Sequence, residues 1–467
     1  MPLFWLRLVV LLFCGLAVSI IAKAGTCNNS TYFIVSGVDF EGNETTKENV
    51  LLLELDFASG DTIATDQVEE RLEENRKRLL NLRLFHEVGF RYDCEGGQLS
   101  VVYFMQERWY LYPVLIFDYA DRNFNAWLEK KDLGRLDYGI SLTRRNFRGR
   151  NEDVRLKLQH GFNRKVELSY RIPYISHRLK LGLDLGLAHY RSRTMNYTNS
   201  YNRQRFLVQD DVFPIQRNAF SVGLVHRQSV QRYEALRFSL HQEAISDSAL
   251  AISPDYFRNQ LQERQYARLE LSKVVNLRNN FSYPLTGRYY DVSASQAIFF
   301  KNTGAPVTTF RAKFSEYFQL SEKLYYAASA EGQVRLSDHY TFADNIALGF
   351  RSLVRGYELF VVGGQHYGLV KQGLSRELVN ISGFRVKQLK SAKFNRIPLA
   401  LYLNAFADAG YVHDNIYHES NQLTNKLLIG GGLGVHVVTF YDMVFRMEYA
   451  INREGDKGLY FTTGFPF

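Results

Sequence analysis

Two residues of opposite charge suggest the chemistry of this sequence. Arg355 lies within "FRSLVRGYELF", residues 350–360, in a connection from about 336 to 365 that is too long for a hairpin turn. Asp408 lies on the alternating segment "LALYLNAFADAG". A guanidinium and a carboxylate can form a bidentate, charge-assisted pair. We therefore expect Arg355 to meet Asp408 and to hold the long loop in place; the alternative is a solvated loop arginine.

The neighbours of Arg355 suit such a contact. Gly356 allows a tight backbone turn, and Tyr357 can wedge against a wall. The candidate site is therefore the tetrapeptide Val354, Arg355, Gly356 and Tyr357, with Asp408 as its partner.

Motifs for catalysis do not accompany this pair. The sequence contains no G-x-S-x-G, H-E-x-x-H or P-loop motif and no metal-spaced Cys/His cluster. We expect no enzyme activity, no metal site and no cofactor. The formal net charge of +9 is modest for 467 residues, so nucleic acid is not an expected partner.

Strands must position the candidate site. From about residue 110 onward apolar and polar residues alternate, as they do when successive side chains face two different environments. Phe and Tyr are abundant (34 and 30 residues) and Pro is scarce (9), which also favours extended structure. The expected strands are 112–121, 135–145, 152–161, 164–172, 178–190, 218–228, 233–243, 262–274, 286–299, 307–318, 322–335, 366–379, 396–411, 427–438, 441–450 and 457–467.

These segments favour a membrane barrel over a soluble sandwich, which would show the same period. They run to about ten residues, the length of a tilted spanning strand. Their polar face is dense in charge, as a water-filled lumen allows, and a barrel leaves no open edges. The last strand ends in aromatic residues, and Phe461, Phe465 and Phe467 share a face with Leu459. We expect a mainly β fold with a sixteen-stranded antiparallel barrel over 110–467, and we assign 203–213 to a loop.

The phase of the alternation places Asp408 in the lumen. Leu401 and Leu403 would face lipid, so the intervening residues of that strand face inward. An arginine on a loop that folds into the lumen can then reach Asp408. Gly430, Gly432 and Gly434 alternate on a later strand, where they either thin the lumen wall beside the loop or mark a bend.

The N-terminus has the pattern of an exported protein. Residues 1–24 predict a signal peptide, because Arg7 precedes an apolar core from Leu8 to Ile21 and Ala22-Lys23-Ala24 forms a cleavage site. The alternative is a membrane anchor. A short segment, 25–31, follows. Export would leave Cys27 and Cys94 as an even pair in an oxidising compartment, where they either form a disulfide or remain free thiols.

Residues 32–106 form a separate small unit with the expected order β-α-α-β-β. Strand 32–40 precedes helices through 55 and over 65–80, with a capping box at Thr45–Glu48, and two hairpin strands follow. The stretches "VSGVDFEGNETT" and "LLNLRLFHEVGF" resemble a polypeptide-transport-associated (POTRA) domain. The resemblance implies that the first and third strands lie parallel, which would bring Cys27 near Cys94. The alternative is a generic small α/β module.

The whole of 32–467 resembles the BamA-type outer-membrane assembly and two-partner secretion superfamily. Val354-Arg355-Gly356-Tyr357 matches its V-R-G-[FY] loop motif, and Phe406-Ala407-Asp408-Ala409-Gly410 matches F-x-D-x-G. Ser375-Arg376-Glu377-Leu378 matches an S-x-E-L segment, which makes Glu377 a second expected partner of the loop. "RRNFRGRNEDVRLKL", "ELSYRIPYI" and "YPLTGRYYDVSAS" follow in the family order.

The resemblance implies a function at the bacterial outer membrane, with the POTRA domain in the periplasm. The expected partners are unfolded outer-membrane or exported client polypeptides, outer-membrane lipids and accessory lipoproteins. The seam between the first and last strands would open to clients, and Phe461, Phe465, Pro466 and Phe467 mark it, because Pro466 lacks an N–H for pairing. The alternatives are a dedicated secretion pore and a passive porin-like channel. The sequence has room for one POTRA domain, whereas BamA-type factors usually carry several, so the resemblance implies a short, specialised member.

Overall fold

The computed structural model describes most of the chain beyond residue 30. The described residues are 31–119, 136–176, 178–201, 203–209, 211–385, 396–439, 443–465 and 467. The expected signal peptide, Cys27 and Pro466 lie outside them. Within these ranges, no helix is both long enough and apolar enough to span a bilayer.

The N-terminal domain is a four-stranded sheet with helices. Its sheet order is β2-β1-β4-β3, and β1 and β4 are parallel, as the resemblance implied. The sequence prediction lacked β2, whose three residues are too short to show an alternating pattern. The elements are β1 (Tyr32–Glu41), α2 (Glu48–Leu52), β2 (Thr62–Ala64), the 3-10 turn η1 (Thr65–Gln67), α3 (Val68–Asn81), β3 (Phe85–Glu95) and β4 (Gln98–Glu107).

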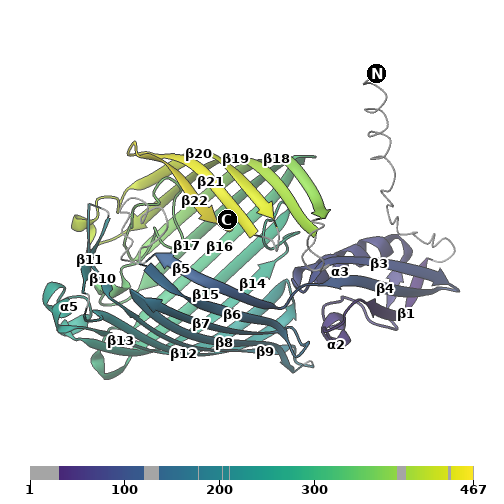
Figure 1. Ribbon diagram of the computed structural model, residues 1–467, viewed down its shortest axis with the longest axis horizontal. Helices are drawn as coiled ribbons and strands as arrows, with labels where there is room; N and C mark the ends of the chain where they lie inside the picture. Colours follow the sequence, from purple (N-terminus) through teal and green to yellow (C-terminus); the bar gives the residue numbers. More distant parts are fainter. Residues whose placement is uncertain are drawn as a thin grey trace, which may run out of the picture.

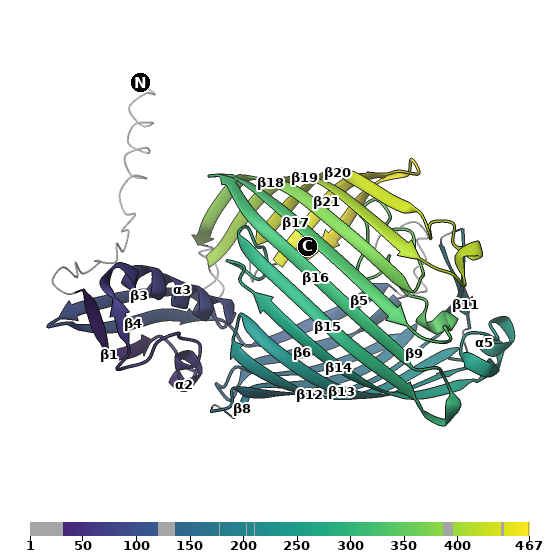
Figure 2. The same ribbon diagram turned by 180° about the vertical axis from the view of Figure 1, so that it is seen from behind.

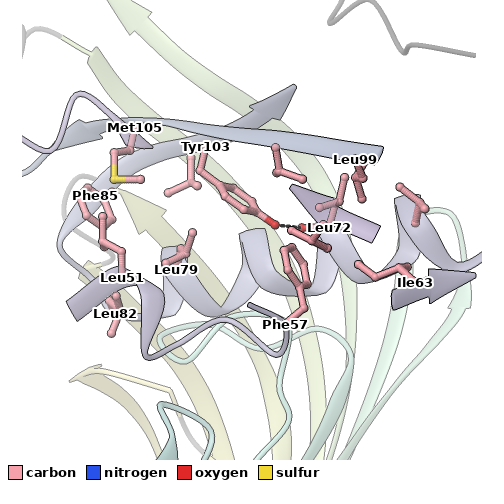
Figure 3. Packing of buried hydrophobic residues seen from close by; sticks show 14 of the residues in the cluster. Leu51, Phe57, Ile63, Leu72, Leu79, Leu82, Phe85, Leu99, Tyr103 and Met105 are labelled. Atoms are coloured by element: carbon pink, nitrogen blue, oxygen red, sulfur yellow. Dashed lines mark hydrogen bonds between the residues drawn. The ribbon is translucent and has the colours of Figure 1, made fainter. Parts of the chain in front are cut away.

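This domain has its own hydrophobic core, which lies between α3 and one face of the sheet (Figure 3). Leu72 and Leu79 lie on the face of α3 that points away from solvent. They pack against alternate residues of β4, namely Leu99, Val101 and Tyr103. The Tyr103 hydroxyl donates a hydrogen bond to the carbonyl of Leu72 at 3.3 Å, so its polar atom is satisfied inside the core.

The start of α2 differs from the expected capping box. The N-cap residue is Lys47, and no side chain caps the helix. Instead, the carboxylate of Glu107 accepts hydrogen bonds from the backbone N–H of Thr45 and Thr46 and from the Thr46 hydroxyl. The prediction of a capping box was wrong, because a distant carboxylate on β4 accepts the hydrogen bonds from N–H groups that a local side chain would have satisfied.

Sixteen strands form the barrel, as predicted, and every neighbouring pair in the sheet is antiparallel. The order follows the sequence from β5 to β22, except that β10 and β11 pair with each other outside this sheet. Figures 1 and 2 show the tilted strands from opposite sides. The barrel strands are β5 (Leu111–Tyr119), β6 (Leu136–Phe147), β7 (Glu152–Gly161), β8 (Asn163–Ser176), β9 (Leu181–Ser192), β12 (Ile215–Ser229), β13 (Arg232–Ile245), β14 (Glu263–Asn276), β15 (Gly287–Phe299), β16 (Val307–Ser321), β17 (Leu324–Leu336), β18 (His366–Arg385), β19 (Arg396–His413), β20 (Leu427–Thr439), β21 (Met443–Asn452) and β22 (Lys457–Thr463).

The apolar side of the alternation faces outward, which excludes a soluble sandwich. Leu187, Leu271 and Leu433 are exposed on the outer face, whereas Ser315 and Glu448 are buried inside. A soluble sandwich would bury its apolar face as a core. An outward apolar face is stable only against lipid, so the alternation describes a membrane barrel.

The remaining elements lie at the end of the barrel away from the N-terminal domain (Figure 1). The stretch assigned to a loop contains β11, which forms a hairpin with β10 and does not join the barrel. These elements are β10 (Thr194–Ser200), β11 (Arg203–Val208), α5 (Asp247–Ile252) and the 3-10 turns η2 (Arg258–Gln260), η3 (Phe300–Asn302), η4 (Phe342–Asp344) and η5 (His418–Ser420).

Two polar contacts attach the N-terminal domain to the other end of the barrel. The first is at Thr46, whose hydroxyl accepts a hydrogen bond from the side chain of Asn146 at 2.8 Å, beside a backbone bond from Lys47 to Gly149. The second is at Glu54, which is 1% exposed. It pairs with Arg227 at 2.9 Å and accepts hydrogen bonds from the Tyr174 hydroxyl and the backbone N–H of Val230. We call this second contact the Glu54 joint.

Candidate functional site

The long connection between β17 and β18 brings Arg355 into the lumen against β19. The guanidinium donates to both carboxylate oxygens of Asp408, from Nε at 2.8 Å and from Nη2 at 2.6 Å, and the backbone N–H of Arg355 donates to the same group at 3.1 Å. Arg355 is 2% exposed. The geometry is the bidentate pair expected from the sequence, with a third bond from the loop backbone.

Two aromatic rings cover the guanidinium. Its central carbon lies 3.9 Å from the ring centroid of Phe406 and 5.3 Å from that of Phe467. Phe406 is on the same inward face of β19 as Asp408, two residues away. The rings exclude water and attract the cation, so both effects strengthen the pair with Asp408.

Glu448 on β21 is a second carboxylate at Arg355, which we did not predict. It accepts a hydrogen bond from Nη1 of Arg355 at 3.3 Å and pairs with Arg446 at 2.9 Å. His436 lies at 3.4 Å from the same carboxylate and is bonded to the Tyr283 hydroxyl. Arg355 and Arg446 therefore share the Glu448 carboxylate. The alternation of 441–450 placed Arg446 and Glu448 on the inner face, and this was the signal that could have identified them.

Glycines let the loop backbone lie against the wall. Gly356 has φ +97°, a left-handed conformation that favours glycine, and its carbonyl accepts a hydrogen bond from the side chain of Asn452. A Cβ at Gly430 would lie 1.9 Å from the carbonyl oxygen of Arg355, so only glycine fits there. Of the two alternatives for the glycines of β20, Gly430 therefore fits the thinned wall.

Val354 and Tyr357 pack on either side of Arg355. Both are buried in an apolar cluster that includes Leu348, Val412 and Leu428. The Tyr357 hydroxyl donates a hydrogen bond to Glu454, at the start of the connection between β21 and β22. Tyr357 thus contacts the wall, as expected, and it ties the loop to the last hairpin of the barrel.

Glu358 is a buried carboxyl next to the motif. It is 3% exposed and accepts a hydrogen bond from the backbone N–H of Gly356 at 2.8 Å. Burial raises the pKa of Glu358 to about 7, and the nearby Glu448 acts in the same direction. The docked loop therefore favours the neutral form of this group.

Further polar contacts hold the loop along its length. Ser352 donates to Glu331 on β17 at 2.6 Å, and the same carboxylate pairs with Arg311. Near the start of the loop, Asp344 pairs with Arg264 on β14 at 3.0 Å. The loop is thus attached to several strands, which makes it an ordered part of the lumen.

Glu377 does not contact Arg355, in contrast to the expectation. Its carboxylate accepts hydrogen bonds from the Tyr402 hydroxyl at 3.2 Å and from the side chain of Asn380 at 3.0 Å. On β18 Arg355 reaches the carbonyl of Gln372, and Glu377 is five residues, about 17 Å, further along the strand. The S-x-E-L match identified an inward residue at the wrong depth in the lumen.

The terminal aromatic residues divide between the two faces of the barrel. Phe461 is exposed on the outer face of β22, as expected. Gly464, with φ +84°, follows the last strand residue and turns the chain. Phe465 then contacts Tyr283 and Tyr317, and Phe467 contacts Tyr317 and Arg355, so neither shares the outer face. The prediction of one shared face was wrong because it extended the alternation past Gly464.

Cys94 is disulfide-bonded. Cys27, its expected partner, lies outside the described residues, so the pairing of Cys27 with Cys94 stays a prediction.

The arrangement immobilises the loop against the barrel wall. The guanidinium of Arg355 makes hydrogen bonds from all three of its nitrogens and lies beside two aromatic rings. No group of metal-binding side chains occurs in the part of the chain that the structure describes. The contacts of Arg355 with Asp408, Glu448 and Phe467 join the loop to the wall and to the end of the chain, and we call them the loop lock.

Comparison with known proteins agrees with this geometry. The family model described as the Omp85 superfamily domain matches residues 146–467, and the POTRA model, described as a surface antigen variable number repeat, matches residues 33–108. No curated protein sequence is similar enough to match.

Solved structures show the same fold at low sequence identity. BamA from Haemophilus ducreyi lacking POTRA domains 1–3 is 14% identical, with a TM-score of 0.52, over 93% of this chain and 84% of that one. CdiB from Escherichia coli is 13% identical, with a TM-score of 0.52, over 92% of this chain and 75% of that one. The chain therefore belongs to the Omp85 superfamily, as an outer-membrane β-barrel protein with one POTRA domain on the periplasmic side.

Proposed function

We propose that this protein assists the insertion or translocation of other polypeptides at the outer membrane. Family membership supports polypeptide clients in general; the pathway through the molecule is our proposal. A client segment first adds to the edge of the POTRA sheet, where β2 pairs with only Tyr32–Ile34 of β1 among the described residues. It then moves to the seam between β5 and β22.

The ending of the last strand carries this proposal. β22 has seven residues, and Gly464 turns the chain away from the sheet directly after it. Among the described residues, the sheet order ends at β5 and β22 without a pairing between them. A short last strand leaves N–H and C=O groups that an incoming strand can pair with. A client strand can therefore be templated here at low cost.

The loop lock keeps the barrel in the competent state. Arg355 connects β19, β21 and Phe467, so it joins the wall beside the seam to the residues that follow β22. Loss of the lock would free the loop and these residues together.

Depletion of the protein, followed by quantitative proteomics of the outer membrane, tests the function. Loss of many barrel proteins places the chain in general assembly, and loss of one exported or surface protein makes it a dedicated translocase or client-specific insertase. An unchanged outer membrane, with high conductance of the purified protein, would contradict the proposal and favour a passive channel.

Complementation by loop variants tests the mechanism in the same strain. Arg355→Ala is expected to insert into the membrane and to fail to restore the depleted proteins. Arg351→Ala is the matched control, because Arg351 is an exposed arginine of the same loop. Normal complementation by Arg355→Ala would remove the lock from the mechanism.

A further inference from the structure

Three arginines converge on one phenylalanine at the outer rim of the barrel. The guanidinium carbons of Arg164, Arg191 and Arg193 lie 5.0, 4.5 and 5.8 Å from the ring centroid of Phe213. Arg164 and Arg191 are directly opposite each other on β8 and β9, and Arg193 follows the end of β9. We call these four residues the arginine cluster.

Among the described residues, the arginine cluster has no ion-pair partner. The Nε atoms of all three arginines are buried without a hydrogen-bond partner. None of the ion pairs among the described residues involves them; Asp211, two positions before Phe213, is exposed and Asp210 lies outside these residues. Three guanidinium groups around one neutral ring repel one another, and the ring offsets this repulsion only in part. An anion would offset this repulsion.

The arginine cluster faces outward. On β8, Arg164 shares its face with Val166 and Leu168, which are exposed on the outer surface, whereas Asn163 is buried inside. On β9, Arg191 shares its face with Leu187, another exposed residue of the outer belt. The cations therefore lie at the margin of the lipid-facing surface.

This margin belongs to the outer leaflet. The POTRA domain contacts the turns at Gly149 and Val230, which mark the periplasmic end of the barrel. Arg164 begins β8 and Arg191 is near the end of β9, at the opposite end. Figure 1 likewise places β10 and β11, which follow Arg193, away from the POTRA domain.

We propose that the arginine cluster binds the phosphates of an outer-leaflet glycolipid of the lipopolysaccharide type. Arginine is suited to phosphate because its planar fork donates two parallel hydrogen bonds. The exposed row at Val166, Leu187 and Phe220 lies next to the cluster on the same face and fits acyl chains. A ligand with an anionic head and several acyl chains can contact both the arginine cluster and the apolar row, whereas a soluble anion can contact the arginine cluster alone.

Titration of the full-length protein in detergent tests the proposal. The probes are lipid A with both phosphates, the same lipid after phosphate removal, and inorganic phosphate, with binding measured by native mass spectrometry. R164Q/R191Q/R193Q is expected to weaken binding of phosphorylated lipid A by roughly a hundredfold or more, since each charge-assisted contact is worth about tenfold. Dephosphorylated lipid A is expected to bind the native protein as weakly as phosphorylated lipid A binds this variant.

A matched variant carries three changes in the other leaflet. Arg232, Lys273 and Arg288 are exposed on the outer face near the periplasmic end, and R232Q/K273Q/R288Q is expected to keep native lipid A affinity. Heat-dependent migration in gels checks that both variants are folded. Equal losses in the two variants would overturn the proposal by showing a non-specific charge effect. Native affinity of R164Q/R191Q/R193Q, or equal affinity for lipid A and inorganic phosphate, would overturn it as well.

Discussion

The loop lock and the Glu54 joint each bury one charged side chain against the barrel. Arg355 attaches the lumen loop, Glu54 attaches the POTRA domain, and the two side chains have different partners. Arg355 meets two carboxylates, a backbone carbonyl and two aromatic rings. Glu54 meets one arginine, a tyrosine hydroxyl and one backbone N–H. The side chain of Arg227 keeps 14% of its exposure, whereas that of Asp408 is fully buried.

This difference indicates how reversible each attachment is. Removal of Arg355 leaves the Asp408 carboxylate without its bidentate partner in a site from which water is excluded, whereas Glu448 keeps Arg446. A buried charge without its partner is costly. Removal of the Glu54 charge leaves one arginine that can still reach water. The loop is thus held firmly in place, and the POTRA domain is held by a weaker contact that can open more easily.

The largest expected effect is that of Arg355→Ala. We expect the free energy that holds the loop in its docked position to fall by about 3–5 kcal/mol, because Asp408 and Glu448 lose their common partner. Hydrogen exchange over residues 346–362 measures this loss, and exchange should approach that of an open loop while the barrel strands stay protected. Arg351→Ala is the control. Protection that survives Arg355→Ala would mean that the two attachments do not differ as described.

The next effect is a pH dependence of the loop lock. The pKa of Glu358 is raised to about 7 from an ordinary value of 4.5, so the docked loop favours the neutral carboxyl more than the free loop does. The resulting stability of the docked loop is complete below about pH 4.5 and is lost as the pH rises through 7. The loss is on the order of 3 kcal/mol. Exchange of residues 346–362, corrected for intrinsic rates, should therefore quicken between pH 5 and 8. Glu358→Gln should remove this dependence; an unchanged profile would refute the assignment to Glu358.

A smaller effect is expected for Glu54→Gln. The substitution keeps the shape of the side chain and weakens a charged pair, so the joint should lose about 1–3 kcal/mol. Distances between spin labels on the POTRA domain and the barrel should broaden while loop protection stays native. Glu48→Gln, an exposed neighbour on α2, provides the control. A loss at the Glu54 joint as large as that of the loop in Arg355→Ala would show that the two attachments do not differ in strength.

The smallest effect is expected for Glu377→Gln. Glu377 bonds to Tyr402 and Asn380, away from the loop, so loop protection should change by less than about 1 kcal/mol. The same exchange measurement applies. Loop release comparable to that of Arg355→Ala would restore Glu377 as a partner of the lock.

The sequence predicted the elements whose signal is local or repeated. Alternation located all sixteen strands, because each strand has the same period and the apolar face must meet lipid. Arg355 and Asp408 were found together because each lies in a compact motif. The inward phase of β19 gave the correct face for Asp408.

The features that the sequence did not predict depend on contacts between distant residues. Glu54 and Arg227 lie in no motif, and the stretch that contains Tyr174 does not reveal its partner. Only the docked domain brings the three residues together. Glu448 lay on a face that we had identified, but the depth of the loop in the lumen was needed to select it. The prediction that Glu377 contacts the loop failed for the same reason, since a strand pattern fixes which face a residue lies on and leaves its depth in the lumen undetermined.

The Glu54 joint also constrains the order of folding. The buried residues of the POTRA core lie between Phe33 and Tyr110, 77 positions apart, whereas the joint connects residue 54 with residues 120 and 176 positions later. Contacts of long sequence separation form slowly, because a large loop must close before any bond rewards it. The POTRA domain can therefore fold first and wait undocked. Its docking then requires that β8, β12 and the turn at Val230 are in place, because the partners of Glu54 lie there.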